Sequence, residues 1–342
     1  MKNKMHLTIK STLLTAGVLA LCIANTHAAS DYKSPKNSLG QPDIGGIWSN
    51  ATTTPFERPR EFGDQLILRE DQAAKIQGAA EDYRAAGNVP TDPNEGAPKD
   101  KNTNAGYNRF WTDPGTQVMR VDGKPRSSMI TTTADGRVPK RKAGAPPYVR
   151  ARPGATIPDK DGNMVGRNDN PEGRALSERC IFMQTAAGPV MRPVLYNNNY
   201  LISQGTDTVA IVVEMVHDTR IIHIGGKHRN DGVKNWMGDS IGWYEDNSLV
   251  VETIDFHPEQ SFYGATDKLK VTERFTRVAD DRLLYQFTIE DPNVWDEPWG
   301  GEYEFWESPG IYEYACHEGN IGMEGILAGA RAEERRAAEG KK

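Results

Sequence analysis

Three glutamates, Glu214, Glu252 and Glu273, interrupt apolar stretches of this sequence that have the alternation of β-strands. Because successive side chains of a strand point to opposite faces, the apolar neighbours predict that each carboxylate faces inward. An unpaired charge is costly to bury, so each glutamate needs a partner, a raised pKa or a wet cavity. Carboxylates held in this way can act as general acids or bases.

A compact set of titratable groups follows Glu214: His217, Asp218 and Arg220. Imidazole titrates near neutral pH and suits proton transfer, and a guanidinium suits binding of an anion. The alternative is an ordinary hairpin corner on the surface. The sequence therefore predicts a proton-transfer site with five catalytic residues, which are His217, Asp218, Glu214, Glu252 and Glu273.

Five further residues are predicted to bind substrate: Arg220, Asn198, Tyr200, Trp236 and Tyr285. Arg220 and Tyr285 are candidate partners for inward carboxylates, and Asn198 belongs to a run of three asparagines. The structural alternatives are that inward Glu–Arg pairs only stabilise the fold and that asparagines make turns. Tryptophans likewise supply core area more often than they stack on a ligand. An error of one residue in register would also turn each glutamate to solvent.

No cofactor or metal is predicted. The sequence has no glycine-rich phosphate loop leading into a helix and no Gly-x-Ser-x-Gly elbow. His217, Asp218 and His223 could share a metal ion, but the two histidines flank an expected tight turn and need not lie on one face.

The N-terminus is typical of a secretory signal peptide. Three lysines precede the apolar run 13–23, and Thr26 and Ala28 are the small residues of an expected cleavage site after Ala28. A membrane anchor, or a lipoprotein with its lipid on Cys22, is less consistent with the short apolar run and with bulky Leu21. We therefore expect a periplasmic or secreted protein without membrane insertion.

Cleavage would leave two cysteines, Cys180 and Cys316. In an oxidising compartment the default is one disulfide between them. The alternative is a free thiol at Cys316, activated by the adjacent His317 as a nucleophile.

The composition restricts the possible partners. The formal net charge is −6, and loss of the signal peptide removes lysines but no acids. This balance argues against nucleic acid and anionic membranes as partners. The expected partner is a small-molecule ligand or substrate.

The elements that must position these residues are mainly strands. The pattern predicts a helix over 70–86, a hairpin turning at Asp122–Gly123 and a short edge strand within 42–48. After Cys180 it predicts strands joined by short turns, and then a helix over 321–339. The expected strands are 200–204, 209–217, 219–224, 240–245, 248–256, 268–277, 282–290 and 301–307.

Such strands predict an antiparallel meander that forms a barrel or strongly curled sheet of lipocalin type. The expected organisation is a signal peptide over 1–28, an irregular segment over 29–180 that packs on the main body, and a barrel-like core with the last helix over 181–342.

Several strings resemble a group of secreted bacterial proteins to which no activity is attached. They include Tyr196–Tyr200, Glu214–Arg220, Trp236–Ser240 and Tyr312–Asn320, which read YNNNY, EMVHDTR, WMGDS and YEYACHEGN. The resemblance runs over nearly all of the chain after the signal peptide. It implies a shared single-domain fold and implies no reaction.

Two functions follow as hypotheses. The first is a cofactor-free enzyme, a lyase, dehydratase or isomerase, whose acid–base side chains act on a small apolar or aromatic substrate in a barrel cavity. The second is a periplasmic protein that binds a small ligand in the same cavity without changing it. The sequence favours the enzyme because three acids and a histidine exceed what binding an apolar ligand requires.

Overall fold

The computed structural model describes residues 32–88, 94, 112–147, 156–158, 164–166, 168–260, 262–318 and 320–340. The chain divides into Met1–Tyr32 and Lys33–Lys342, and the described strands and helices all belong to the second unit. The predicted signal peptide, 1–28, lies outside the described residues. Within them, no helix has both the length and the apolar character needed to cross a bilayer.

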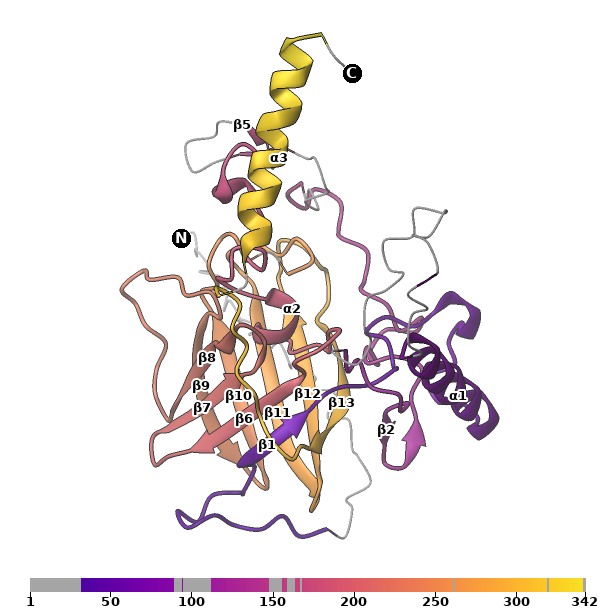
Figure 1. Cartoon of the computed structure of the whole chain (residues 1–342). Helices are drawn as coiled ribbons and strands as arrows, with labels where there is room; N and C mark the ends of the chain where they lie inside the picture. Colours follow the sequence, from indigo (N-terminus) through magenta and orange to yellow (C-terminus); the bar gives the residue numbers. More distant parts are fainter. Residues whose placement is uncertain are drawn as a thin grey trace, which may run out of the picture. The chain divides into compact units, whose positions relative to one another are not determined.

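Nine of the described strands close into one barrel, in the order β1-β13-β12-β11-β10-β9-β8-β7-β6, and β6 pairs back onto β1 (Figure 1). The prediction of a mainly β barrel is confirmed. The strands are β1 (Gly46–Ser49), β6 (Asn199–Gln204), β7 (Thr208–Val213), β8 (Thr219–Ile224), β9 (Asp239–Glu245), β10 (Ser248–Ile254), β11 (Lys270–Ala279), β12 (Arg282–Glu290) and β13 (Trp299–Glu307).

Two details of the topology differ from the prediction. β1 pairs with β6 on one side and with β13 on the other, so it closes the barrel and is not an edge strand. The barrel therefore takes one strand from the segment 29–180. β8 and β9 are parallel, where a meander requires an antiparallel pair. Residues 225–238 supply the long connection that a parallel pair needs.

Aromatic side chains fill the barrel. Phe275, Tyr285, Phe287, Tyr303 and Phe305 are each at most 3% exposed. Their ring centroids lie between 5.0 and 6.4 Å apart across β11, β12 and β13. The interior between these strands is thus a packed aromatic core around a few buried polar groups.

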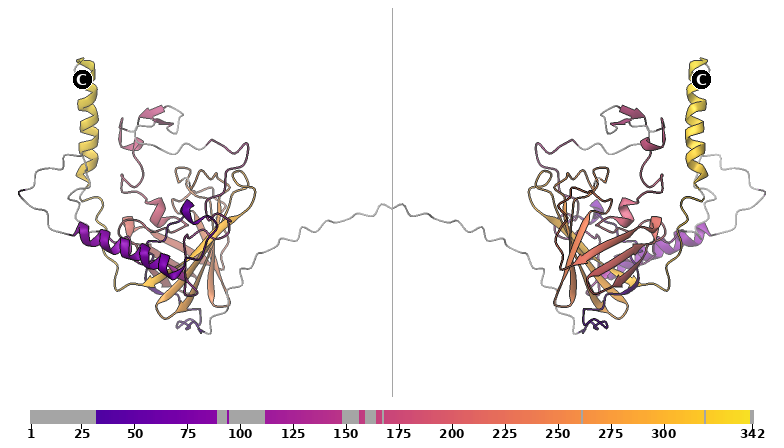
Figure 2. Two further views of the ribbon diagram at one scale, coloured as in Figure 1. Left: turned by 90° about the vertical axis from the view of Figure 1, so that its right-hand side faces the viewer. Right: turned by 90° about the vertical axis from the view of Figure 1, so that its left-hand side faces the viewer.

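The remaining elements confirm the predicted helices and hairpin, and both long helices lie outside the barrel (Figure 2). The Asp122–Gly123 turn joins β2 to β3, with φ of 52° and 70° at the two residues. These elements are η1 (Arg60–Phe62), α1 (Glu70–Gly87), β2 (Arg120–Val121), β3 (Lys124–Pro125), β4 (Thr156–Pro158), β5 (Met164–Gly166), η3 (Pro171–Gly173), α2 (Gln184–Ala187), η4 (Met215–His217) and α3 (Ile321–Ala338).

A short segment extends the sheet beyond the reach of β1. Met129 accepts a backbone hydrogen bond from Glu302, and Ile130 bridges to Gly301. A Cβ on Gly301 would lie 1.9 Å from the carbonyl oxygen of Met129, so no side chain fits there. Met129 and Ile130 also donate to the carbonyls of Pro55 and Phe56. The segment 52–56 is therefore attached to β13 near its first residues.

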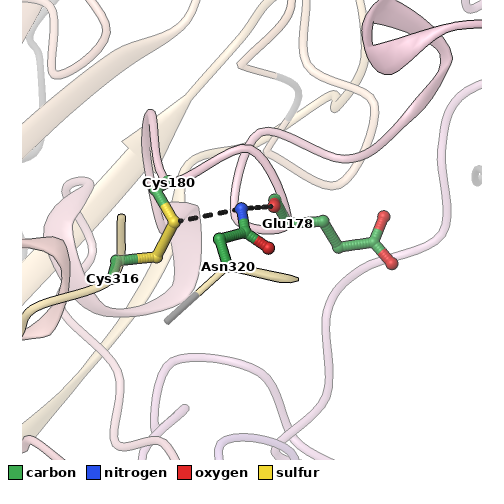
Figure 3. Close-up of a disulfide and its surroundings, with 4 residues drawn as sticks. All are labelled: Glu178, Cys180, Cys316 and Asn320. Carbon is green, nitrogen blue, oxygen red and sulfur yellow. Dashed lines mark hydrogen bonds between the residues drawn. A yellow bond between two sulfur atoms is a disulfide. The ribbon is translucent and has the colours of Figure 1, made fainter. Parts of the chain in front are cut away.

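Cys180 and Cys316 form a disulfide (Figure 3). Asn320 Nδ2 donates to the carbonyl of Glu178 at 3.0 Å and to Cys180 Sγ at 3.6 Å. The predicted pairing is confirmed, so Cys316 has no free thiol to act as a nucleophile with His317.

Candidate functional site

Glu273 lies in the middle of the barrel, as its strand pattern predicts. Its carboxylate accepts hydrogen bonds from Arg220 of β8 and, at 2.7 Å, from the hydroxyl of Tyr285 of β12. Glu273 is 0% exposed and Arg220 is 2% exposed. Burial and the charge of Glu273 raise the pKa of Tyr285 well above its ordinary value, so the phenol stays protonated and donates. These three residues form a hydrogen-bonded cluster around the Arg220–Glu273 ion pair, within aromatic packing.

Glu252 does not join this cluster. Val251 of β10 is paired with inward Glu273, so Glu252 points to the outer face of the barrel. Its side chain is 29% exposed and lies 3.3 Å from His228 Nε2 and 3.6 Å from Lys270 Nζ. The prediction that Glu252 faces inward was wrong, and its neighbour Val251 faces inward instead. Both faces of β10 carry apolar residues, so the alternation pattern does not show which face is inside.

Glu214 lies just after the end of β7, before the short helix η4. Its carboxylate accepts from the backbone N–H and side chain of Asn199 and, at 2.9 Å, from the backbone N–H of Tyr312. It thereby attaches the segment after β13 to the β6–β7 pair. Glu214, Glu252 and Glu273 have different hydrogen-bond partners in the described residues, so the expected meeting of three acids in one cavity does not occur.

His217 and Asp218 lie at the C-terminal end of η4. His217 is exposed, with φ of 47°, and Asp218 is partly buried. Burial raises the pKa of Asp218, and the charge of His217 acts in the opposite direction. Neither residue has a side-chain hydrogen bond to the other acids in the described part of the chain. They form a surface corner, which is the structural alternative that the sequence left open.

Asn198 and Tyr200 hold loops together beneath a cleft. Asn198 Oδ1 accepts from Val194 N at 2.7 Å, and its Nδ2 donates to the carbonyls of Val194 and Asp113. The hydroxyl of Tyr200 donates to the carbonyl of Ala186 in α2 at 3.0 Å. Both side chains are buried. Each side chain therefore positions a loop that borders the cleft. Neither side chain is among the lining residues of the cleft itself.

Trp236 lies in a different place, within the segment 225–238. Its ring centroid is 3.8 Å from that of His257 and 6.3 Å from that of Phe182. It packs against the core as a partly buried residue. Trp236 therefore packs against the core, which is the structural alternative to stacking on a ligand.

Two adjoining cavities of about 400 Å³ and about 620 Å³ lie beside the barrel. These volumes are in the range of small-molecule sites. Their shared wall consists of Thr52, Thr53, Pro114 and Leu195. We call the smaller one the arginine cavity and the larger one the outer cavity. The arginine cavity is also lined by Thr54, Pro55, Phe56, Thr185, Arg192, Pro193 and Val194, and the outer cavity by Ala80, Tyr83, Arg84, Thr112, Asp113, Gly115, Thr116 and Tyr196.

Backbone hydrogen bonds fix the walls of these cavities relative to one another. Thr53 N donates to the carbonyl of Gln117 at 3.0 Å, and Asp113 N donates to the carbonyl of Leu195 at 3.0 Å. Arg192 N donates to the carbonyl of Thr185 at 2.7 Å. Three segments that are distant in sequence are thus joined into one preformed cleft.

Arg192 is the charged residue of the arginine cavity. Its guanidinium carbon lies 4.9 Å from the ring centroid of Phe56, 5.5 Å from that of Phe262 and 5.4 Å from that of Tyr263. Nη1 donates to the Tyr263 hydroxyl at 3.0 Å. Nε is shielded from solvent and has no hydrogen-bond partner in the described residues.

No described carboxylate lies within 4.0 Å of Arg192, although most arginines of the barrel are paired with one. A partly buried cation next to aromatic rings lacks the counter-charge that would offset its loss of hydration. The arrangement can therefore bind an anionic group, and cation–π contacts keep the guanidinium in place.

The sequence reading missed Arg192 because Met191-Arg192-Pro193 has no periodic pattern around it. One available signal was its position five residues before the first of the three asparagines, because Asn198 supports its loop. The reading also missed His228, which lies between Asp239 at 2.8 Å and Glu252 at 3.3 Å. His228 holds the segment 225–238 against β9 and β10.

In the described residues, no group of three or more histidines, cysteines and acids is arranged to hold a metal ion.

No protein-family model matches this chain, and comparison with curated proteins finds no significant match.

Proposed function

We propose that this protein binds a small organic molecule with an anionic group in the cleft beside Arg192. The proposal rests on Arg192, whose guanidinium lines the smaller cavity. The guanidinium packs on aromatic rings and donates one hydrogen bond to a phenol, and it has no carboxylate partner among the described residues. A ligand carboxylate can accept two hydrogen bonds from such a group and supply the missing counter-charge. The surrounding Phe56, Val194 and Leu195 suit an apolar body.

This proposal corresponds to the non-catalytic binding protein of the sequence analysis, with the site moved from the barrel interior to the cleft. The acid–base enzyme stays an untested prediction. The dispersed positions of Glu214, Glu252 and Glu273 give it no common site, whereas binding needs only the cleft. Export to the periplasm remains part of the proposal, and a disulfide agrees with an oxidising compartment.

Benzoate and benzamide test the proposal because they have nearly the same shape and differ in charge. Isothermal titration of the purified protein should show saturable binding of benzoate and at least tenfold weaker binding of benzamide. Arg192→Met should abolish the benzoate signal. The matched control is Arg229→Met, which removes the same charge from an exposed ion pair with Asp231 and should leave binding unchanged. Equal affinity of wild-type protein and Arg192→Met for benzoate would refute the proposal.

A native mass spectrum of the protein as purified would complement the titration. If the cleft is occupied in the cell, an added mass should appear with wild-type protein and be absent from Arg192→Met. The mass itself would then identify the natural ligand.

A further inference from the structure

The two cavities differ in chemistry along their length. The arginine cavity has one charged lining residue among those described, Arg192. Among its described lining residues, the outer cavity contains Arg84 and Asp113, whose charges are opposite. A ligand that occupied both cavities would therefore meet one cation in excess among the described lining residues, which is Arg192.

Apolar side chains border the outer cavity and are exposed. Tyr83 of α1 is 65% exposed and Leu195 is 53% exposed, and both are among the largest exposed hydrophobic residues. The ring of Tyr196 also lines this cavity and is stacked on Tyr314 at a centroid distance of 6.3 Å. Such side chains around a concavity are typical of a site for an apolar ligand.

The two cavities adjoin at one set of residues. Thr52, Thr53, Pro114 and Leu195 line each of them, so a ligand longer than either cavity would extend past these residues. The Asp113–Leu195 and Thr53–Gln117 backbone hydrogen bonds hold these residues in position.

We infer that the ligand is an extended monocarboxylate, with its carboxylate at Arg192 and an unbranched or aromatic apolar tail that passes Leu195 toward Tyr83 and Tyr196. This inference rests on the proposed function, because it places the anionic group at Arg192. It adds the length of the ligand, its single charge and the direction in which it lies.

A chain-length series tests the inference. Isothermal titration with butanoate, hexanoate, octanoate and decanoate below their aggregation concentrations should give affinity that rises by up to about fourfold per methylene, as expected for burial of each group. The rise should be smaller in Tyr83→Ser, which changes a residue of the outer cavity alone, while butanoate affinity stays near the wild-type value. Ile221→Ser, which removes a 44% exposed apolar residue outside both cavities, is the matched control and should keep the full rise.

Decyltrimethylammonium has the same tail as a long carboxylate and the opposite charge. It should bind at least tenfold more weakly than decanoate, and equal binding would show non-specific adsorption and overturn the inference. Arg192-dependent binding of butanoate without any gain for longer chains would overturn the extended tail and leave the proposed function in place. If no carboxylate in the series binds in an Arg192-dependent way, both the proposed function and this inference fail.

Discussion

The guanidinium of Arg220 on β8 and the carboxylate of Glu273 on β11 meet across the interior of the barrel. Arg220 Nη2 lies 3.2 Å from Glu273 Oε1, and both side chains are almost completely buried. A buried ion pair contributes little net stability compared with apolar residues, but loss of one partner leaves an uncompensated charge. Substitution of either residue alone should therefore destabilise the core.

Glu273→Gln should lower the free energy of unfolding by about 3–5 kcal/mol, because Arg220 then lies buried without a counter-charge. Arg220→Met should have a similar effect, and the double variant should lose less than the sum of the two. Urea unfolding followed by tryptophan fluorescence measures these differences. Arg274→Gln is the control, because its ion pair with Glu245 is on the exposed face and should contribute less than about 1 kcal/mol. Additive effects of the two core variants would contradict direct coupling.

Glu304 should make stability depend on pH. Burial raises its pKa from 4.5 to about 7, while Arg282 acts in the opposite direction. Because the folded-state pKa lies above that of the unfolded chain, the folded state binds more protons between about pH 4.5 and pH 7. Stability from this group is therefore fully present below the unfolded-state pKa and is lost as the pH rises through about 7.

Glu304→Gln should remove this dependence. The difference in unfolding free energy between wild-type protein and the variant should change by on the order of 2 kcal/mol between mildly acidic and mildly alkaline pH. Comparison with the variant cancels the other titrating groups. A constant difference across the pH range would show that Glu304 titrates normally.

The disulfide should stabilise the fold by restricting the unfolded chain. Cys180 and Cys316 are separated by 136 positions, and closure of a loop of this length is worth about 4–5 kcal/mol in the chain-entropy model. Replacing both cysteines by serine should lower the unfolding free energy by that order. Chemical reduction of the wild-type protein should give the same value, and the unreduced protein should have no titratable thiol among these two residues.

Tyr263 should orient Arg192 for binding. Its hydroxyl accepts from Arg192 Nη1 at 3.0 Å, and its ring contacts the guanidinium. Tyr263→Phe removes the hydrogen bond and keeps the ring, so benzoate affinity should fall by about 3- to 10-fold, as expected for one modest hydrogen bond. Titration should place this variant between wild-type protein and Arg192→Met. A loss as complete as that of Arg192→Met would instead indicate a direct contact between Tyr263 and the ligand.

His228 should control the local stability of the segment 225–238. His228→Ala removes the contacts with Asp239 and Glu252, so amide hydrogen exchange in this segment should accelerate while the core strands keep their protection. His223→Ala is the control, because His223 is an exposed histidine on β8. Unchanged exchange in 225–238 would show that other contacts hold the segment.

The sequence by itself determined most strands of the barrel, the two long helices, the hairpin turn and the disulfide. The strand expected over 209–217 instead ends at Val213, and η4 follows it. Period-two alternation and turn residues identify strands locally, and two cysteines leave one pairing. It also indicated that Glu273 faces inward, because the face of β11 that carries Glu273 is otherwise apolar. Arg220 and Tyr285 were among four candidate partners for the three glutamates, and only the structure assigns them to Glu273.

Only the tertiary structure decided which face of β10 is inside, because both faces are apolar and the choice depends on pairing with β11. It also decided that β1 closes the barrel, since pairing partners distant in sequence leave no local signal. The position of the cleft depended most on the tertiary structure. Thr53, Asp113 and Arg192 belong to irregular segments without periodicity, and only long-range backbone hydrogen bonds bring their segments together.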